Sequence, residues 1–358
     1  MNITDPYPYT PATRVVHAAT SAVGGGIQEM VLALARSCRE SGADVRVLFW
    51  RGGYPSDPGV PYVRLGSTGR AQGWPRAMIR YLRAFRPGLV HLHGPTAGSI
   101  GAVVARLVGV PVIVYTEHNP HDSRPPAARL PRRAACRLPD MNVAISREVA
   151  RSLVEDCGAS RARVRIILNG TPEVPPLSPP SQQPNRFIYV ANLLARKGHE
   201  TLIQAFALAD HAATLSLVGD GPERDGLRAL SQRLGLGDRV SFHGWLDEPW
   251  SVADGALAYV HPARIEGGGI AVMEAMMRGL PVIVTATGGL TDIVQHGQTG
   301  LVVPVGDVNA LAGSMRKLSE APREREALAG AARAFALRHL TLDRMLESYR
   351  ALYRELGT

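Results

Sequence analysis

The feature that most constrains the fold is an alternation of short apolar, β-branched runs with helical stretches, which occurs twice along the 358-residue chain. The first block spans residues 14–145 and the second spans residues 187–303. Continuous apolar runs of this kind are typical of parallel strands in a sheet that helices cover on both faces. The sequence therefore predicts an α/β protein with two doubly wound, Rossmann-like sheets.

The two blocks predict the following elements. In the first block we expect strands at 14–19, 44–49, 89–93, 110–116 and 141–145, and helices at 28–41 and 99–107. In the second block we expect strands at 187–191, 214–218, 240–242, 256–259, 281–285 and 300–303, and helices from residue 199, from residue 223 and at 270–278.

A proline-rich segment separates the blocks, with six prolines between Thr171 and Pro184. No helix or central strand can pass through it. A chain this long is also expected to divide into two cores, because single cores seldom grow beyond about 250 residues. We predict an N-terminal domain at 1–170, a linker at 171–185 and a C-terminal domain at 186–340. A final helix at 341–358 has an apolar face that must dock on another surface.

The overall composition is that of a folded protein, with 45% hydrophobic and 20% charged residues. No apolar stretch reaches the roughly 18 residues of a membrane span, and the first ten residues form no secretory h-region. Cys38, Cys136 and Cys157 are widely spaced and form no CxxC pattern, which argues against a disulfide framework and a zinc site. We expect a cytoplasmic protein, with peripheral attachment to the inner membrane face left open.

The net charge of +9 is concentrated in one region of the chain. The arginines there are Arg124, Arg129, Arg132, Arg133, Arg137, Arg147, Arg151, Arg161, Arg163 and Arg165. An anionic membrane surface, a phosphorylated acceptor or a nucleic acid would each be attracted by such a field. A solvated face explains the cluster equally well. No aromatic residues interleave with the basic ones in the way nucleic-acid surfaces require, so we expect no nucleic-acid partner.

The most informative motif is ARIEGGGIAVMEAMMRG at residues 263–279. Glu266 precedes Gly267, Gly268 and Gly269, and Glu274 follows eight positions after Glu266 in the helix that the glycines begin. The glycines let the backbone approach a ligand, and amides at the helix N-terminus favour an anion or a sugar hydroxyl. Taken alone, the same letters also describe a glycine turn with two surface glutamates.

Lysine usage points to a second residue. Only Lys197 and Lys317 are lysine among 40 basic residues, so arginine is the default cation of this chain. Lys197 follows the first predicted strand of the second domain, where ligands of doubly wound sheets bind. A compact ammonium there suits a diphosphate in a crowded pocket. A solvated lysine in a turn is the alternative.

Six segments in register resemble family 4 of the retaining glycosyltransferases, the glycosyl transferases group 1. They are the Glu266–Glu274 motif, Gly24–Gln28, Thr116–Asn119, Ile167–Gly170, Leu217–Pro222 and Thr287–Leu301. Together they cover nearly the whole chain. The resemblance implies the GT-B fold, in which two Rossmann-like domains face each other across a cleft. It also implies that the C-terminal helix packs back toward the first domain.

The same resemblance assigns site residues. Catalytic roles fall to His118, Lys197 and Glu266. Donor binding falls to Gly25, Gly26, Asn192, Arg196, Lys197, Gly267, Gly268, Gly269, Ile270 and Glu274. The acceptor side falls to His93, Asn119 and Asn169. The chain departs from the family at Asn192, where an arginine is usual. Either Arg196 replaces that cation, or Asn192 gives a neutral hydrogen bond to the diphosphate.

Four further histidines are assigned to the scaffold. We place His91 on the opposite side of its strand from His93 and give it a structural role. His17, His243 and His261 are interpreted as core or loop residues, because a histidine at a strand end is often a satisfied structural one.

The resemblance implies transfer of a hexose or N-acetylhexosamine from a nucleotide-sugar donor, with a UDP-sugar favoured, to a hydroxyl acceptor with retention of configuration. Glycoconjugate, polysaccharide and secondary-metabolite acceptors all fit. No DxD-type pair follows a strand, so we expect neither a metal nor a cofactor. The alternatives are a GT-B sugar-nucleotide epimerase or phosphorylase, and a non-catalytic binding protein for sugar nucleotides or nucleic acid.

Overall fold

The structure, a computed structural model, describes residues 13–21, 26–51, 59–65, 73–119, 136–177, 186–209 and 212–357. The chain divides into two compact units, which are described separately. Unit 1 comprises residues 1–169 together with 343–358, and unit 2 comprises residues 170–342. The division falls one residue from the predicted domain end at 170. The C-terminal segment belongs to unit 1, as the resemblance implied.

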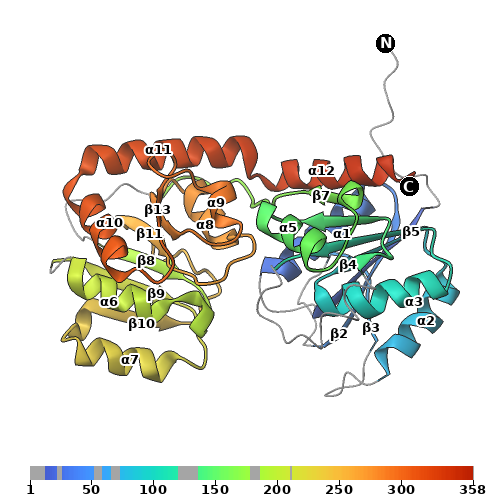
Figure 1. Ribbon diagram of the computed structural model, residues 1–358, viewed down its shortest axis with the longest axis horizontal. Coiled ribbons are helices and arrows are strands. Elements are labelled where there is room, and N and C mark those ends of the chain that lie inside the picture. Colours follow the sequence, from blue (N-terminus) through green and yellow to red (C-terminus); the bar gives the residue numbers. More distant parts are fainter. Residues whose placement is uncertain are drawn as a thin grey trace, which may run out of the picture. The chain divides into compact units, whose positions relative to one another are not determined.

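Unit 1 is built on a seven-stranded parallel sheet with the order β3-β2-β1-β4-β5-β6-β7 (Figure 1). Its strands are β1 (Arg14–Ser21), β2 (Asp44–Arg51), β3 (Tyr62–Arg64), β4 (Leu89–His93), β5 (Val112–Glu117), β6 (Met141–Ala144) and β7 (Val164–Ile166). The order reverses between β1 and β4, which makes the sheet doubly wound. Ligands of such sheets bind beyond the carboxyl ends of the strands at this reversal.

The two faces of this sheet differ chemically, because neighbouring residues on a strand point to opposite faces. Val16 and Ala18 of β1 and Leu92 of β4 lie in an apolar core with buried residues of α2, α3 and α5. His17 and His91 lie on the other face, against α1 and α12. The helices are α1 (Gly26–Glu40), α2 (Trp74–Phe85), α3 (Ala102–Leu107), which follows the π-turn η1 (Ala97–Gly101), α5 (Arg147–Glu155) and α12 (Leu342–Glu355).

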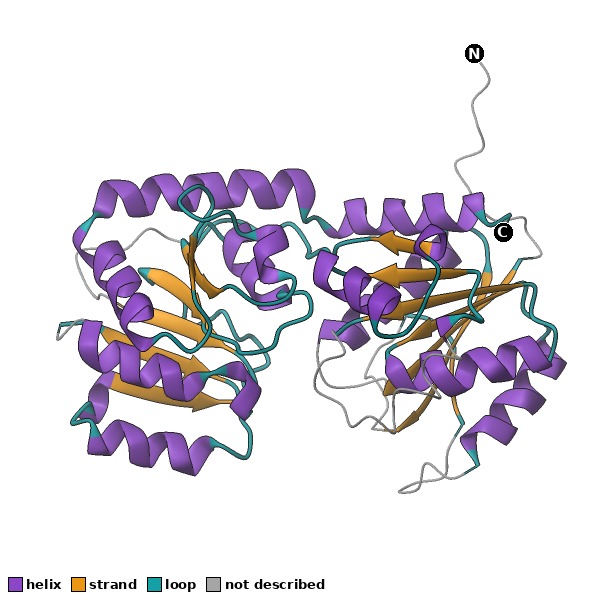
Figure 2. Ribbon diagram, viewed as in Figure 1, coloured by secondary structure: helices purple, strands orange, loops and turns teal. Residues whose placement is uncertain are grey.

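Unit 2 is built on a six-stranded parallel sheet with the order β10-β9-β8-β11-β12-β13. Its strands are β8 (Arg186–Val190), β9 (Thr214–Val218), β10 (Val240–Gly244), β11 (Ala258–His261), β12 (Val282–Thr285) and β13 (Leu301–Val303). Its helices are α6 (His199–Ala209), α7 (Arg224–Arg233), α8 (Ile270–Met277), α9 (Leu290–Ile293), α10 (Val308–Glu320) and α11 (Pro322–His339). Figure 2 shows helices on both faces of each sheet.

Every strand and helix predicted in the two blocks is present, with ends shifted by a few residues. No element was predicted at β3, β7, α2, α5, α9, α10 or α11. In the predicted linker, Thr171 forms an isolated bridge with Thr341, residues 172–177 are irregular, and residues 178–185 lie outside the described part. Within the described ranges, no helix combines the length and apolar character that a membrane crossing requires.

Candidate active site

The candidate active site of unit 2 lies where two neighbouring parallel strands, β8 and β11, end at the same edge of the sheet. Lys197 closes the short 3-10 helix η4 (Ala195–Lys197) that follows β8. Glu266 lies in the loop that joins β11 to α8. This edge is where ligands bind in open α/β sheets.

The two loops are held together through their backbones. The Arg264 amide donates to the Arg196 carbonyl oxygen at 2.8 Å. Gly198 has φ 71°, and a Cβ atom there would lie 2.0 Å from the Pro262 carbonyl oxygen. Only glycine permits both the left-handed backbone and this close approach. The contact fixes the position of Lys197 relative to the loop that carries Glu266.

Lys197, Glu266 and His261 form one hydrogen-bonded group. The Lys197 Nζ lies 2.7 Å from Glu266 Oε2, and the side chains of these two residues are 15% and 12% exposed. The His261 Nε2 lies 2.9 Å from the same oxygen, and His261 is buried. Partly desolvated charge-assisted bonds of this kind are stronger than exposed ones. The group is therefore a rigid cluster of charge.

The other oxygen of Glu266 is occupied by backbone amides. The amides of Gly267 and Gly269 donate to Oε1 at 3.1 and 3.3 Å. Glu266 thus accepts four hydrogen bonds, which is about the capacity of a carboxylate. We expected these glycine amides and the Glu266 side chain to meet a ligand, whereas the structure pairs them with one another. The amide of Ile270 starts α8 and has no carbonyl partner within that helix.

The pKa directions follow from these contacts. Burial raises the pKa of Glu266, but the bonds from His261 and Lys197 outweigh burial and hold it well below its usual range. Burial lowers the pKa of His261, and the bond to Glu266 opposes that effect. A neutral His261 donates from Nε2 to the carboxylate, so its Nδ1 accepts from the Tyr259 hydroxyl 2.9 Å away. Tyr259 therefore fixes the orientation of His261.

His261 is the site residue that sequence analysis missed, because it was interpreted as a core or loop residue. It closes β11, five positions before Glu266. The available signal was this position at a strand end near the glutamate. The interpretation of His243 as a core or loop residue was wrong, since His243 lies exposed on strand β10 and its ring contacts the Ser216 hydroxyl on the neighbouring strand at 3.1 Å.

Glu274 lies about one turn into α8 and has partners of its own. The Trp250 Nε1 donates to Glu274 Oε2 at 2.9 Å, and the Arg278 guanidinium lies 4.8 Å from the centre of the Trp250 ring. Burial raises the pKa of Glu274, while Trp250 and Arg278 oppose the rise. The donor from Trp250 leaves further acceptor positions on this carboxylate for a ligand.

The β8–η4 loop that carries Asn192 and Arg196 is pinned by the turn after β9. A Cβ atom at Gly219 would lie 2.1 Å from the Ala191 carbonyl oxygen, and one at Gly221 would lie 2.4 Å from that of Leu193. The Asn192 and Arg196 side chains are exposed on this fixed loop. In unit 1, Gly26 is the first residue of α1, while Gly25 lies outside the described residues.

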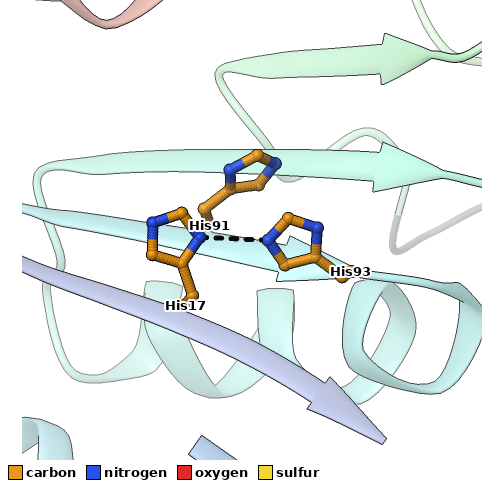
Figure 3. A group of neighbouring side chains, drawn as sticks. All are labelled: His17, His91 and His93. Carbon is orange, nitrogen blue, oxygen red and sulfur yellow. Dashed lines mark hydrogen bonds between the residues drawn. The ribbon is translucent and has the colours of Figure 1, made fainter. Parts of the chain in front are cut away.

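Unit 1 gathers three buried histidines on the face of its sheet opposite the apolar core, as Figure 3 shows. The His17 Nδ1 lies 3.1 Å from His93 Nε2. His91 contacts the Tyr353 hydroxyl at 2.5 Å and the Thr116 hydroxyl at 2.7 Å. The predicted placement of His91 on the other side of β4 was wrong, since residues two apart on a strand share a face. Its structural role fits the hydrogen bonds.

These three rings have one nitrogen each within 4.8 Å of the others, close enough to share a metal ion. Burial lowers the pKa of His17 to about 3 and those of His91 and His93 well below the usual range. The rings are neutral at pH 7. A metal would have to replace the direct His17–His93 hydrogen bond, so the observed geometry is that of a hydrogen-bonded set.

Three buried residues of the predicted site, His93, His118 and Asn169, carry polar side-chain atoms inside unit 1. Among the residues that the structure describes, both ring nitrogens of buried His118, Nδ1 of His93 and Oδ1 of Asn169 have no hydrogen-bond partner. The His118 and His93 rings are stacked with centroids 6.0 Å apart. Buried polar atoms are rarely left unpaired, so such a group suggests a ligand. The backbone amide of Asn119 donates to the Glu117 carboxylate at 3.3 Å.

Two family models match the chain. The model described as Glycosyltransferase Family 4 matches residues 24–173, and the model described as Glycosyl transferases group 1 matches residues 173–335. They meet at the boundary between the two units. Together they span both sheets, as the motifs predicted.

Two curated relatives match most of their own length. The 2-deoxystreptamine N-acetyl-D-glucosaminyltransferase of Streptomyces fradiae is 30% identical, over 91% of this chain and 90% of that protein. The D-inositol 3-phosphate glycosyltransferase of Thermomonospora curvata is 29% identical, over 81% of this chain and 78% of that protein.

Solved structures share the fold. Alr3699/HepE of Anabaena in complex with UDP and glucose has a TM-score of 0.85 at 21% identity and covers 96% of this chain and 100% of that one. Sucrose-phosphate synthase from Thermosynechococcus elongatus has a TM-score of 0.84 at 23% identity and covers 96% of this chain and 99% of that one. The predicted GT-B fold is thereby confirmed.

Proposed function

The chain belongs to family 4 of the glycosyltransferases, and from this premise we propose that it transfers a hexose or N-acetylhexosamine from a UDP-sugar to a hydroxyl group with retention of configuration. The observation that carries the proposal is the Lys197–Glu266–His261 group at the carboxyl edge of the second sheet. That edge is the expected place for a nucleotide ligand. Alr3699/HepE, which has the same fold, was solved with UDP and glucose, which supports the choice of donor.

In this proposal the donor diphosphate is neutralised by protein groups alone. The Lys197 ammonium and the Ile270 amide, where the α8 dipole is positive, are placed to meet charge that builds on the leaving diphosphate. Preorganised donors of this kind are often worth on the order of 10² to 10³ in rate each. We therefore propose a reaction that needs neither a metal nor a cofactor.

Glu266 acts by positioning in this scheme, because its four hydrogen bonds leave it little capacity for substrate. It holds the Lys197 ammonium in place and fixes the start of α8. Glu274, with acceptor positions left, is placed to take the ribose hydroxyls. In the bond-forming step the bond from the anomeric carbon to the phosphate oxygen breaks. The acceptor oxygen bonds to that carbon on the same face, and the departing phosphate oxygen takes the acceptor proton.

We further propose that the acceptor is a small cyclic polyol of secondary metabolism. The two relatives above carry 2-deoxystreptamine and D-inositol 3-phosphate in their names, and both compounds are ring polyols. His93 and His118 supply neutral ring nitrogens that have no partner in the described part of the chain and can bind acceptor hydroxyls at neutral pH. Burial lowers the pKa of His118 to about 4, so this ring does not add a cation.

The test is incubation with a panel of UDP-, GDP- and ADP-sugars and measurement of nucleotide release, with and without each ring polyol. We expect one UDP-sugar to be consumed, faster with an acceptor, and unaffected by a chelator. NMR of the product should show the anomeric configuration of the donor. Conversion of the sugar nucleotide without any acceptor product would instead indicate an epimerase. Inverted configuration would contradict the proposal.

A further inference from the structure

A surface of unit 1 that takes no part in the site above combines exposed aliphatic and basic side chains. We call it the α2–α3 surface and define it by six residues: Arg76, Arg80, Arg83, Ile100, Val103 and Leu107. Ile100, Val103 and Leu107 are 42%, 41% and 71% exposed. They follow one another at helical spacings of three and four along η1 and α3, so they share one side. Isolated exposed apolar residues are ordinary, but an aligned row on one short helical segment is not.

The arginines of α2 are arranged in the same way. Arg76, Arg80 and Arg83 are exposed at spacings of four and three, opposite the buried Trp74, Met78 and Leu82. In Figure 1, α2 lies beside α3, and the two helices contact each other. Both pack their buried residues into the same apolar core on one face of the sheet. Their exposed sides therefore point outward from the same helical layer.

The charge of this region has one sign. Residues 58–116 contain no aspartate or glutamate. The same stretch contains Arg64, Arg70, Arg76, Arg80, Arg83, Arg86 and Arg106. Each of the three α2 arginines therefore lacks an acidic neighbour within its own segment. The combination of aliphatic residues with an uncompensated basic row matches helices that lie in a membrane interface.

We propose that the α2–α3 surface docks the enzyme on an anionic lipid bilayer. Aliphatic side chains enter the headgroup region while the arginines contact lipid phosphates. A second copy of this chain is a poor occupant, because two such surfaces would bring six arginines together. Nucleic acid is disfavoured since the exposed row is aliphatic, whereas single strands need aromatic side chains for stacking.

This surface differs from the arginine-rich segment at 124–165 that sequence analysis offered for membrane contact. Arg124, Arg129, Arg132 and Arg133 lie outside the described residues. In the described part, Arg165 forms an ion pair with Glu355 at 2.9 Å, and Glu148, Glu155 and Asp156 are interspersed with the arginines. That segment is therefore partly compensated, and contact through it stays a prediction.

The test is co-sedimentation of the full chain with vesicles of phosphatidylcholine alone or mixed with phosphatidylglycerol. We expect binding only to the mixed vesicles, and weaker binding as salt is raised. Each arginine near an anionic surface contributes roughly a fivefold gain in affinity. The triple variant R76Q/R80Q/R83Q should therefore bind the mixed vesicles with about 100-fold lower affinity. Leu107→Asp should also weaken binding while the net charge changes by only one.

Matched controls come from unit 2. The variant R233Q/R323Q/R338Q removes three exposed arginines, and Leu208→Asp changes an exposed leucine on α6. Both should bind the mixed vesicles almost as the native chain does. All substituted side chains are exposed, and thermal unfolding verifies that each variant folds. The proposal is wrong if the native chain does not bind the mixed vesicles, or if the control variants lose as much affinity for them as the α2–α3 variants do. It is also wrong if the chain binds single-stranded nucleic acid in place of vesicles.

Discussion

The two units present their polar groups in opposite ways. In unit 2, Lys197, Glu266 and His261 form a charged cluster in which the carboxylate has a full set of partners. In unit 1, His93 and His118 are neutral and keep ring nitrogens that no described residue contacts by a hydrogen bond. A charged group with a full set of partners suits a part that must stay fixed while negative charge builds on a leaving diphosphate, and an unpaired neutral group suits binding of a hydroxyl. This difference supports the proposal that the donor binds at the first cluster and the acceptor at the second.

The largest effect should come from removing the cation of the charged cluster. Lys197→Met should lower the rate of sugar transfer by on the order of 10² to 10³, because it deletes a preorganised positive charge. The matched control is Lys317→Met, which removes the only other lysine and a surface ion pair with Glu324. An exposed ion pair of this kind should contribute little to stability. Steady-state nucleotide release measures both variants, and similar rates for the two would remove the distinction drawn between the clusters.

The next largest effect concerns the backbone contact that supports the charged cluster. Gly198→Ala should destabilise unit 2 by about 2 kcal/mol or more, because alanine disfavours φ 71° and its Cβ would overlap the Pro262 carbonyl. Gly313→Ala on α10, where nothing lies within 4 Å, should stabilise the unit by roughly 0.5–1 kcal/mol. Thermal unfolding compares the stability of the two variants. An unchanged stability of Gly198→Ala would show that the close approach to Pro262 is not required.

Acid should act on the neutral cluster. The folded-state pKa of His118 is lowered from 6.5 to about 4, and that of His17 to about 3. Between the folded and unfolded pKa values the unfolded chain binds more protons, so stability is complete above about pH 6.5 and falls as the pH drops toward 4. Each such histidine contributes a slope of at most about 1.4 kcal/mol per pH unit. Urea unfolding at several pH values measures this slope, and His17→Gln should reduce it. A stability of unit 1 that does not change from pH 7 to 4.5 would be the contrary result.

The smallest effect should come from trimming a neutral ring. His118→Ala removes one hydrogen-bonding group and should lower transfer by about tenfold. The rate of the native enzyme should show no titration near pH 6.5 from this residue, since burial keeps its pKa near 4. His339→Ala, an exposed histidine on α11, is the control. A loss as large as that from Lys197→Met would mean that His118 carries charge-dependent chemistry.

The apolar pattern of the sequence predicted the fold well where the strands are long or central. The runs at 89–93 and 214–218 match β4 and β9 residue for residue. It gave nothing at β3 and β7, which have three residues each and lack a periodic pattern. The short edge strands are defined by pairing with a neighbour, as when Val47 pairs with Tyr62, and a local pattern does not contain that information.

Only part of the site could be predicted, because a local pattern does not contain the contacts between distant residues. The Glu266 motif and Lys197 could be chosen from residue type and position, and the structure places them in direct contact. His261 was missed because its role depends on the distance from its ring to Glu266 across a loop. The saturation of Glu266 by Gly267 and Gly269 amides is also a product of three-dimensional geometry. The residue types indicate which polar groups could bind a ligand, whereas the contacts in the folded chain decide which of those groups still have hydrogen-bonding capacity.

The most direct test of the central distinction compares Glu266→Gln with His91→Gln, using the donor that the native chain consumes fastest, at a temperature where both variants are folded. We expect Glu266→Gln to lose at least about 100-fold in nucleotide release, because Lys197 and His261 lose their anionic partner. His91→Gln should keep activity within a few-fold and unfold at a lower temperature, since His91 bonds Tyr353 and Thr116 inside unit 1. A fully active Glu266→Gln beside an inactive, folded His91→Gln would contradict the account.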